Sequence, residues 1–256
     1  LWGDSHAAAL EPAVSAMAAR AGHKGVMITS NLCPPVLGVW RNIVNKRRAL
    51  DCEGKRALAH EYATRAGVSA VILASNWTSM VQSKLRGIPG PLLRDAQTKG
   101  APTPAKARAA LQRGLDRTVT ALNPSARDIW FVRQVPYFGQ STDFDAIITR
   151  RHLAVWVPWL DMPEAPPSIP LADHRAWQAP ADRILDTVAD RHGLRVIDPA
   201  SALCDAPSAL ERACHLSRDE AVFYFDADHL SATGARHIAE IFRPVFGDAD
   251  RETAGR

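Results

Sequence analysis

The chain has 256 residues, 46% of them hydrophobic and 23% charged, so it can bury a sizeable core as one α/β domain or two small ones. This composition excludes a disordered tail, a collagen-like fibre and a disulfide-stabilised mini-protein. The net charge is +4, but the densest basic cluster is only Lys46-Arg47-Arg48, which favours a solvated surface over a nucleic-acid-binding track. We expect no membrane helix, because no stretch approaches the roughly 18–20 apolar residues that one needs. We expect no signal peptide, because Asp4 and His6 precede any apolar run.

Apolar runs of the β type alternate with helical patterns in the first half of the chain, which predicts a parallel sheet covered by helices. The expected elements, in order, are a strand at 1–2, a turn at 3–6, a helix over 7–21 ended by Gly22, a strand over 25–29, a loop over 31–50, a helix over 53–65 ended by Gly67, and a central strand over 69–75. Asn76 and Trp77 stand at the carboxyl end of that central strand.

The second half continues the alternation. We expect a loop over 86–104, a helix over 104–122 capped by Thr103, a strand over 128–135, partly helical structure over 143–160, an irregular connection over 161–172, a helix over 173–192, and strands over 194–198 and 222–225. Residues 199–221 are expected as a loop or short helix. A turn at 226–229 and a closing helix over 231–246 with Ser231 as its N-cap follow. One domain over 1–246 is expected, with a frayed polar tail at 247–256.

Four cysteines fall into two local groups, Cys33 with Cys52 and Cys204 with Cys214. Four cysteines allow three connectivities, of which the nearest-neighbour one closes short loops. Two disulfides imply an oxidising compartment, whereas four buried free thiols in a cytosolic enzyme remain the alternative. The spacing contains no CxxC and no Cys/His cluster, so it does not suggest zinc.

Two short segments carry groups suited to nucleophilic catalysis. Gly3-Asp4-Ser5-His6 follows a strand and precedes a helix, where an open α/β sheet binds ligands and the helix N-terminus favours an oxyanion. Asp226-Ala227-Asp228-His229 supplies a histidine base and a carboxylate three residues before it. Asp228 is the less favoured partner of His229, because an adjacent side chain is expected to point elsewhere. Asp4 is expected to shape its turn, and His6 either lines a pocket or faces solvent.

Together these segments resemble the SGNH (GDSL-type) esterase superfamily. The resemblance implies an α/β fold with three α/β/α layers and a parallel sheet, the flavodoxin-like SGNH hydrolase fold. It implies Ser5 as nucleophile, His229 as base and Asp226 as the carboxylate that orients it. Asn76 and Gly38 correspond to the oxyanion-hole residues.

A narrower resemblance rests on several stretches that occur together. They are Gly-Asp-Ser-His, Cys33-Pro34-Pro35 through Gly38, the strand that ends before Trp77, and the run from Asp198 through Cys204 and Cys214 to His229. They are similar to the SGNH domain fused behind membrane acyltransferase family three proteins, bacterial O-acetyltransferases that modify surface polysaccharides such as lipopolysaccharide. An excised C-terminal domain of that kind is expected to start at its first strand, as this chain does. The family implies a domain that is itself soluble, on the periplasmic face of the inner membrane, and this location favours the local disulfides Cys33–Cys52 and Cys204–Cys214.

The implied reaction is two-step acyl transfer through Ser5 to a hydroxyl of a surface glycan, with no metal and no organic cofactor in this domain. The implied partners are an acyl donor presented by the membrane acyltransferase domain of the same parent chain, and a glycan acceptor, but no nucleic acid. A free-standing carbohydrate esterase of the same fold and a non-catalytic glycan-binding module are the alternatives. A hard-metal phosphoesterase site formed by Asp4, His6, Asp226, Asp228 and His229 is a more distant one. Trp40 and Trp77 either stack on sugar rings or pack in the core.

Overall fold

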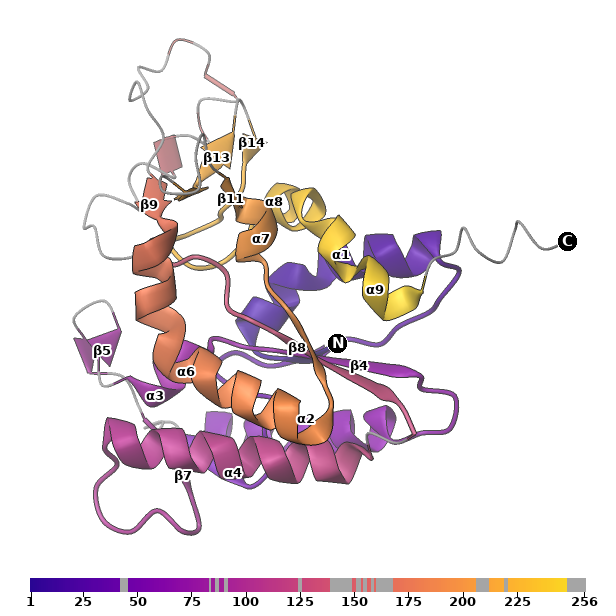
Figure 1. Ribbon diagram of the computed structural model, residues 1–256, viewed down its shortest axis with the longest axis vertical. Coiled ribbons are helices and arrows are strands. Elements are labelled where there is room, and N and C mark those ends of the chain that lie inside the picture. Colours follow the sequence, from indigo (N-terminus) through magenta and orange to yellow (C-terminus); the bar gives the residue numbers. More distant parts are fainter. Residues whose placement is uncertain are drawn as a thin grey trace, which may run out of the picture. The chain divides into compact units, whose positions relative to one another are not determined.

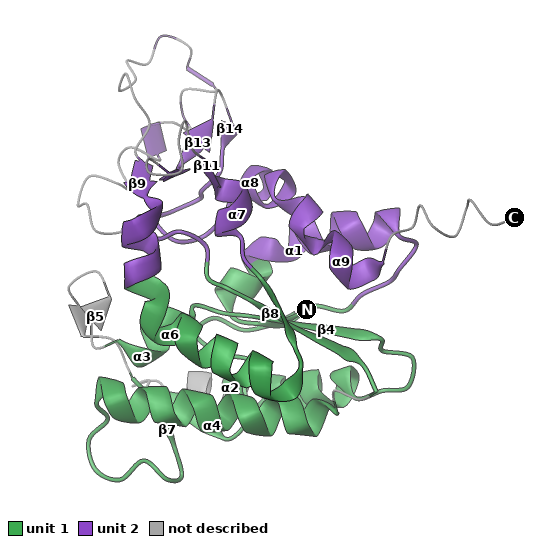
Figure 2. Cartoon of the chain, viewed as in Figure 1, with its two compact units in different colours: residues 1–8, 26–134, 177–197 green, residues 9–25, 135–176, 198–256 purple. Residues whose placement is uncertain are grey.

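The structure is a computed structural model that describes residues 1–41, 46–82, 84–85, 88–89, 92–123, 126–138, 149–150, 153, 156–157, 159, 168–205, 212–218 and 221–247. Contacts between residues divide the chain into two compact units, each made of three chain segments (Figure 2). Unit 1 comprises residues 1–8, 26–134 and 177–197, and unit 2 comprises residues 9–25, 135–176 and 198–256. Unit 1 holds the main sheet, and unit 2 holds smaller sheets that include the second cysteine pair.

A parallel sheet forms the centre of unit 1 (Figure 1). Its strands are β1 (Trp2–Gly3), β2 (Ile28–Thr29), β4 (Ala70–Ala74), β8 (Asp128–Val132) and β10 (Arg195–Ile197). They lie in the order β10-β8-β4-β1-β2, and every neighbouring pair is parallel. Numbered along the chain, this is the 2-1-3-4-5 order of flavodoxin-like sheets, which bind ligands at the carboxyl ends of the strands where the winding reverses. Here the reversal lies between β1 and β4, directly before Ser5 and Asn76.

Both faces of this sheet are buried, as the continuous apolar sequence of β4 requires. Successive strand residues point to opposite faces. One face carries Val71, Leu73, Ile129 and Phe131, which belong to a core cluster with side chains of α2 (Lys46–Ala63), α4 (Pro104–Leu122) and α6 (Leu171–His192). The alternate residues Ile72, Trp130 and Val132 on the other face are also buried. The predicted α/β fold, a parallel sheet flanked by helices, is therefore confirmed.

Helix α4 confirms its sequence prediction at both ends. The hydroxyl of Thr103 accepts a hydrogen bond from the backbone N–H of Lys106, Pro104 occupies the first turn, and Asn123 ends the helix in the left-handed conformation. Helix α1 (Ser5–Arg20) begins two residues before the predicted start, and the short helix α3 (Trp77–Val81) was not predicted. Among the helices of the described residues, none is long and apolar enough to cross a membrane.

Unit 2 combines the C-terminal part of α1 with short elements. Its helices are α7 (Ala200–Leu203), α8 (Ala232–His237), the 3-10 helix η1 (Ala239–Phe242) and α9 (Arg243–Phe246). Its strands are β9 (Ser168–Pro170), β11 (Cys204–Asp205), β12 (Ala213–His215), β13 (Ser217–Arg218) and β14 (Ala221–Val222). Aromatic rings fill its interior, with Phe138 edge-on to Tyr224 at 4.8 Å and Phe223 stacked on His237 at 4.4 Å between ring centroids.

Several short elements differ from the sequence predictions. The expected loops over 31–50 and 86–104 contain β3 (Val39–Arg41), which pairs with β7 (Leu93–Asp95), and β6 (Ile88–Pro89), which pairs with β5 (Lys84–Leu85) just before the second loop. Strands of two or three residues are too short to show an alternating pattern. Strand β9 likewise lies in the expected irregular connection, and α2 begins at Lys46 instead of Glu53.

The predicted closing helix begins with the predicted N-cap, but it is not a single continuous helix. The hydroxyl of Ser231 accepts from the backbone N–H of Gly234, as an N-cap does. The helix then divides into α8, η1 and α9. Pro244 lies in the first turn of α9 and has no N–H to donate to the carbonyl of Glu240, which accounts for the division between η1 and α9. The tail after Gly247 and most of the stretch predicted as partly helical over 143–160 lie outside the described residues.

Both expected disulfides are present. Cys33 is bonded to Cys52 in unit 1 at 2.02 Å, and Cys204 to Cys214 in unit 2 at 2.03 Å. None of the four cysteines is free, so the alternative of four buried thiols is wrong.

Candidate active site

Gly3, Asp4 and Ser5 lead from β1 directly into α1. A Cβ atom at Gly3 would lie 1.8 Å from the carbonyl oxygen of Ala74 in β4 and 2.6 Å from the Cβ of Ala7, so only glycine fits between the strand and the first helical turn. Ser5 therefore stands at the carboxyl edge of the sheet, at the N-terminus of a 16-residue helix. The first backbone N–H groups of such a helix have no partner within it and carry partial positive charge.

Asp4 caps α1 and ties it to the chain that follows β4. Its Oδ1 accepts from the backbone N–H of His6 at 2.9 Å, and its Oδ2 accepts from the hydroxyl of Ser75 at 2.5 Å and from the backbone N–H of Asn76 at 3.0 Å. The side chain is almost fully buried. Three protein donors thus hold this carboxylate, which confirms that Asp4 shapes its turn and argues against its use as a metal ligand.

Asn76 caps the short helix α3 and contacts His6. Its Oδ1 accepts from the backbone N–H of Ser79 at 3.1 Å, and its Nδ2 lies 3.0 Å from Nε2 of His6. Both residues are buried, so of the two alternatives for His6 the solvent-facing one is wrong. The first turn of α1 and the end of β4 are joined through side chains as well as through the sheet.

Two further residues hold the start of α3. The guanidinium of Arg41, at the end of β3, donates to the carbonyl oxygen of Ser79 at 3.2 Å. Burial lowers the pKa of Arg41, and the negative charge of Asp4 opposes that shift. The side-chain oxygen of Gln134, just after β8, accepts from the backbone N–H of Thr78 at 3.2 Å. These contacts hold the first turn of α3, which Asn76 caps.

The turn that carries His229 is closed in unit 2 by backbone hydrogen bonds. Tyr224 and Leu230 form an antiparallel bridge, and the N–H of Phe225 donates to the carbonyl of His229 at 2.9 Å. Inside the turn, Oδ1 of Asp226 accepts from the backbone N–H groups of Asp228 at 2.9 Å and of His229 at 2.8 Å. The carboxylate thereby holds the backbone that presents the imidazole.

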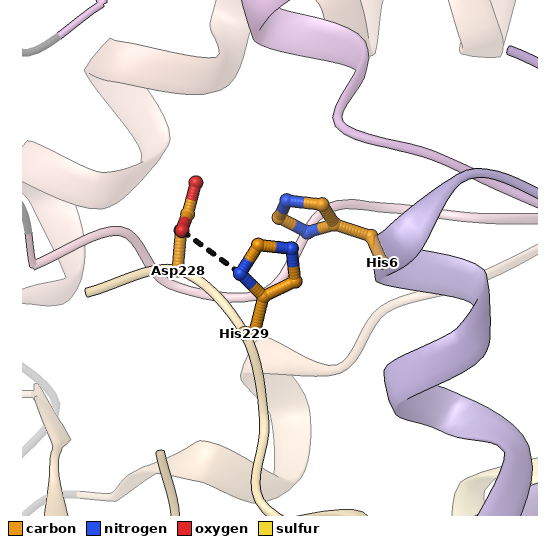
Figure 3. Close-up of side chains that lie close together, drawn as sticks. All are labelled: His6, Asp228 and His229. Carbon is orange, nitrogen blue, oxygen red and sulfur yellow. Dashed lines mark ion pairs between the residues drawn. The ribbon is translucent and has the colours of Figure 1, made fainter. Parts of the chain in front are cut away.

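The ring of His229 is held at Nδ1 by carboxylates. Oδ2 of Asp226 lies 2.8 Å from Nδ1, and Oδ1 of Asp228 lies 3.2 Å from it, the ion pair drawn in Figure 3. The expectation that Asp228 points elsewhere is therefore wrong, because the tight turn brings its carboxylate back to the ring. Burial lowers the pKa of His229, but hydrogen bonds and charge from the two carboxylates outweigh it and raise that pKa from 6.5 to about 10.

Among the described residues, side chains that could each offer an atom to a metal ion already have protein partners, as His6 does in unit 1 and as Asp228 and His229 do in unit 2 (Figure 3). Nε2 of His6 faces Asn76, and Nδ1 of His229 faces two carboxylates. The available groups in unit 1 are a serine at a helix N-terminus and a buried amide that contacts the next residue, His6. In unit 2 the available group is a histidine whose Nδ1 lies 2.8 Å from Asp226. These are the groups that acyl transfer through serine requires.

Comparison with known proteins identifies the family of the chain. The family described as "SGNH domain (fused to AT3 domains)" matches residues 1–244, nearly the whole chain. The chain belongs to this family. The periplasmic domain of the lipopolysaccharide acetyltransferase of Salmonella ser. Paratyphi A matches in structure with a TM-score of 0.58 and 15% identity, over 94% of this chain and 80% of that one. No curated protein matches the sequence.

Of the remaining predicted site residues of this SGNH domain, Trp77 lies in the core, and Trp40 and Gly38 lie at the surface. Trp77 is fully buried and its Nε1 donates to the carbonyl of Val132 at 2.8 Å, so it packs in the core and cannot stack on a sugar. Trp40 in β3 is 45% exposed, and its sugar-binding role stays a prediction. Gly38 is exposed with a φ of 64°, and its carbonyl accepts from the guanidinium of Arg117. Its oxyanion-hole role also stays a prediction.

Sequence reasoning did not find the part that Asp228 plays beside the imidazole or the contact of His6 with Asn76. The repeated aspartate in Asp-Ala-Asp-His was the available signal for Asp228. No sequence signal separates a buried His6 from an exposed one, because the burial depends on the β1–β4 pairing.

Proposed function

We propose that this SGNH domain is the periplasmic domain of a membrane O-acyltransferase and transfers an acetyl or other acyl group through Ser5 to a hydroxyl of a surface glycan, such as lipopolysaccharide O-antigen. The observation that carries the proposal is the contact of Asp226 with Nδ1 of His229 at 2.8 Å, in a chain that belongs to the AT3-fused SGNH family. The proposed domain covers residues 1–246, with 247–256 as a polar tail.

The first step acylates the serine. Nε2 of His229 takes the proton of the Ser5 hydroxyl while Oγ attacks the acyl carbonyl, and Asp226 stabilises the imidazolium that forms. The tetrahedral oxyanion receives hydrogen bonds from the backbone N–H of Ser5 and the amide of Asn76, with Gly38 as a further proposed donor. Each donor of this kind contributes about 3 kcal/mol to the transition state. Collapse breaks the bond to the donor's leaving group, which takes the proton from His229.

The second step deacylates the serine. Nε2 of His229 accepts the proton of an acceptor hydroxyl as that oxygen attacks the acyl-serine carbonyl. The Ser5–acyl bond then breaks, and the proton returns to the Ser5 oxygen. A sugar hydroxyl as acceptor gives an O-acylated glycan, and water gives a free acid. This domain supplies all the required groups from its own side chains and backbone.

The family and the fold support a periplasmic location for the reaction, in a protein that also carries an AT3 domain. The family is fused to AT3 domains, and the similar solved structure is a periplasmic domain. Two disulfides suit an oxidising compartment. We propose that the AT3 domain of the parent protein presents the acyl donor at the periplasmic face of the membrane. A free-standing esterase would need no such partner, and a glycan-binding module would need no Asp226–His229 pair.

Ester hydrolysis by the purified domain tests the catalytic part of the proposal. The wild type is expected to hydrolyse p-nitrophenyl acetate, and Ser5→Ala is expected to reduce the rate to the uncatalysed background. Ser15→Ala is the matched control, because Ser15 is an exposed serine in the same helix that bonds only to Glu11 at 2.5 Å. Equal rates for the wild type and Ser5→Ala would reject a catalytic serine and favour the binding module.

Product analysis separates the transferase from the esterase. The domain is mixed with p-nitrophenyl acetate and purified O-antigen polysaccharide, and acetylated glycan and free acetate are both measured by mass spectrometry. A transferase gives glycan acetate that depends on Ser5. Free acetate alone, unchanged by any glycan, would favour the esterase.

A further inference from the structure

His6 and Asn76 form a buried pair beside the proposed nucleophile, and both residues lie in unit 1. His6 is 6% exposed and Asn76 is 8% exposed. The backbone of each is fixed by Asp4, whose carboxylate accepts from both of their N–H groups. The pair therefore has little freedom except rotation of its two polar side-chain groups.

The orientation of the Asn76 amide follows from its neighbours. A backbone N–H can only donate, so the group that faces the N–H of Ser79 at 3.1 Å must be the amide oxygen. The NH2 group then faces Nε2 of His6 at 3.0 Å. Because NH2 can only donate, Nε2 of His6 is the acceptor of this hydrogen bond.

We infer that His6 is a positioning residue that holds the Asn76 amide in the orientation from which it donates to the oxyanion. An amide NH2 has two N–H bonds. The bond to His6 sets the plane of the amide, and with it the direction of the N–H that the proposed mechanism assigns to the oxyanion. An amide rotated by half a turn would present its oxygen to the developing negative charge and its NH2 to the N–H of Ser79, and both contacts are repulsive.

This inference rests on the proposed function, since it assigns no role to His6 unless Asn76 stabilises an oxyanion. It predicts an effect on the transition state and not on substrate binding. Loss of the acceptor at His6 is expected to lower kcat for ester hydrolysis by about 10- to 100-fold with KM nearly unchanged.

Three substitutions at His6 separate the acceptor from the bulk of the ring. His6→Leu removes the acceptor. His6→Gln places a carbonyl oxygen near the position of Nε2, and His6→Asn is the matched control, because its carbonyl reaches only to the position of Nδ1. We expect kcat to fall in His6→Leu and His6→Asn and to return to within about threefold of the wild type in His6→Gln. Thermal unfolding of each variant is measured alongside.

A double-mutant cycle with Asn76→Ala completes the test. If His6 acts through Asn76, His6→Leu costs less than about threefold in kcat once Asn76 is alanine. Equal fold losses in both backgrounds would overturn the positioning role and leave the proposed function standing. A wild-type kcat in Asn76→Ala would instead reject the oxyanion role of Asn76, and the inference with it. Equal kcat values for His6→Gln and His6→Asn would also overturn it, even if His6→Leu fails to fold.

Discussion

Two carboxylates share one imidazole nitrogen in the turn over 226–229. Asp226 and Asp228 both lie within hydrogen-bond or ion-pair distance of Nδ1 of His229, and they raise its pKa to about 10. A histidine with that pKa holds a proton at neutral pH, whereas the proposed mechanism needs Nε2 as a base. The second carboxylate therefore stabilises the charged ring at the expense of the base form.

Removal of this second charge is expected to shift the pH dependence of hydrolysis. In the wild type, kcat/KM should rise with pH from 7 up to about 10, the pKa of His229. Asp228→Asn keeps the size of the side chain and removes its charge, so the midpoint should move down by at least one pH unit and the rate at pH 7 should rise about tenfold. Asp190→Asn, an exposed aspartate of α6, is the control. A wild-type midpoint near 6.5 that Asp228→Asn leaves unchanged would contradict this prediction.

The raised pKa of His229 also makes the stability of the fold depend on pH. The pKa of His229 is higher in the folded state than the 6.5 of the free group, so its contribution is fully present below about pH 6.5 and is lost as pH rises through 10. The free energy of unfolding from urea titrations should therefore fall between pH 7 and 10 by more in the wild type than in Asp228→Asn. An equal fall in the free energy of unfolding with pH for the wild type and Asp228→Asn would contradict this prediction.

For individual residues, the sequence predicted which side chains belong to the candidate site but not all of their contacts. Ser5 and the Asp226–His229 pair follow from local motifs, and the structure confirms the local contact of that pair. The His6–Asn76 contact joins residues 70 positions apart. It depends on the register of β1 against β4, which no local pattern encodes.

Helix α4 packs closely against the chain segment around the start of β3. A Cβ atom at Gly114 would lie 2.5 Å from a methyl carbon of Val36 and 2.7 Å from one of Val39. The hydroxyl of Thr118, one turn later, accepts from the backbone N–H of Leu37 at 2.8 Å. Gly114 therefore lets the helix lie against the segment that leads into β3.

Opposite effects are expected for two helical glycines. Gly114→Ala gains about 1 kcal/mol of helix propensity but overpacks the contact with Val36 and Val39 at a cost of about 1–3 kcal/mol, so it should be neutral or destabilising. Gly54 in α2 is exposed with open space around it, and Gly54→Ala should stabilise by about 1 kcal/mol. Urea unfolding of both variants measures the difference. Equal stabilisation by the two substitutions would show that Gly114 has room for a methyl group.

Elements with long, regular patterns were predicted well, and short ones were not. The apolar run of β4 and the capped helix α4 carry enough residues for their periodicity to be read. The β3–β7 pair has three residues in each strand, and its pairing is decided by packing on α4. The interruption in the closing helix could have been predicted from Pro244.

At the scale of the whole molecule, the disulfides act on each unit separately. Cys33–Cys52 joins the segment before β3 to α2 in unit 1, and Cys204–Cys214 joins β11 to β12 in unit 2. The sequence separations are 19 and 10 residues. Loops of these lengths stabilise a folded chain by about 3 kcal/mol each through the entropy of the unfolded state. Neither bond includes a residue of the proposed reaction.

Reduction is therefore expected to affect stability far more than the chemistry of the folded protein. Loss of both bonds, about 6 kcal/mol, is a large part of the roughly 5–15 kcal/mol that stabilises a typical domain. The unfolding temperature should fall by about 12–24 °C in reductant, since 1 kcal/mol corresponds to about 2–4 °C for a chain of this size. Paired variants Cys33→Ala/Cys52→Ala and Cys204→Ala/Cys214→Ala should each give about half of that fall, and hydrolysis well below the unfolding temperature should persist. A fall of less than about 4 °C in reductant would show that the fold does not depend on an oxidising compartment.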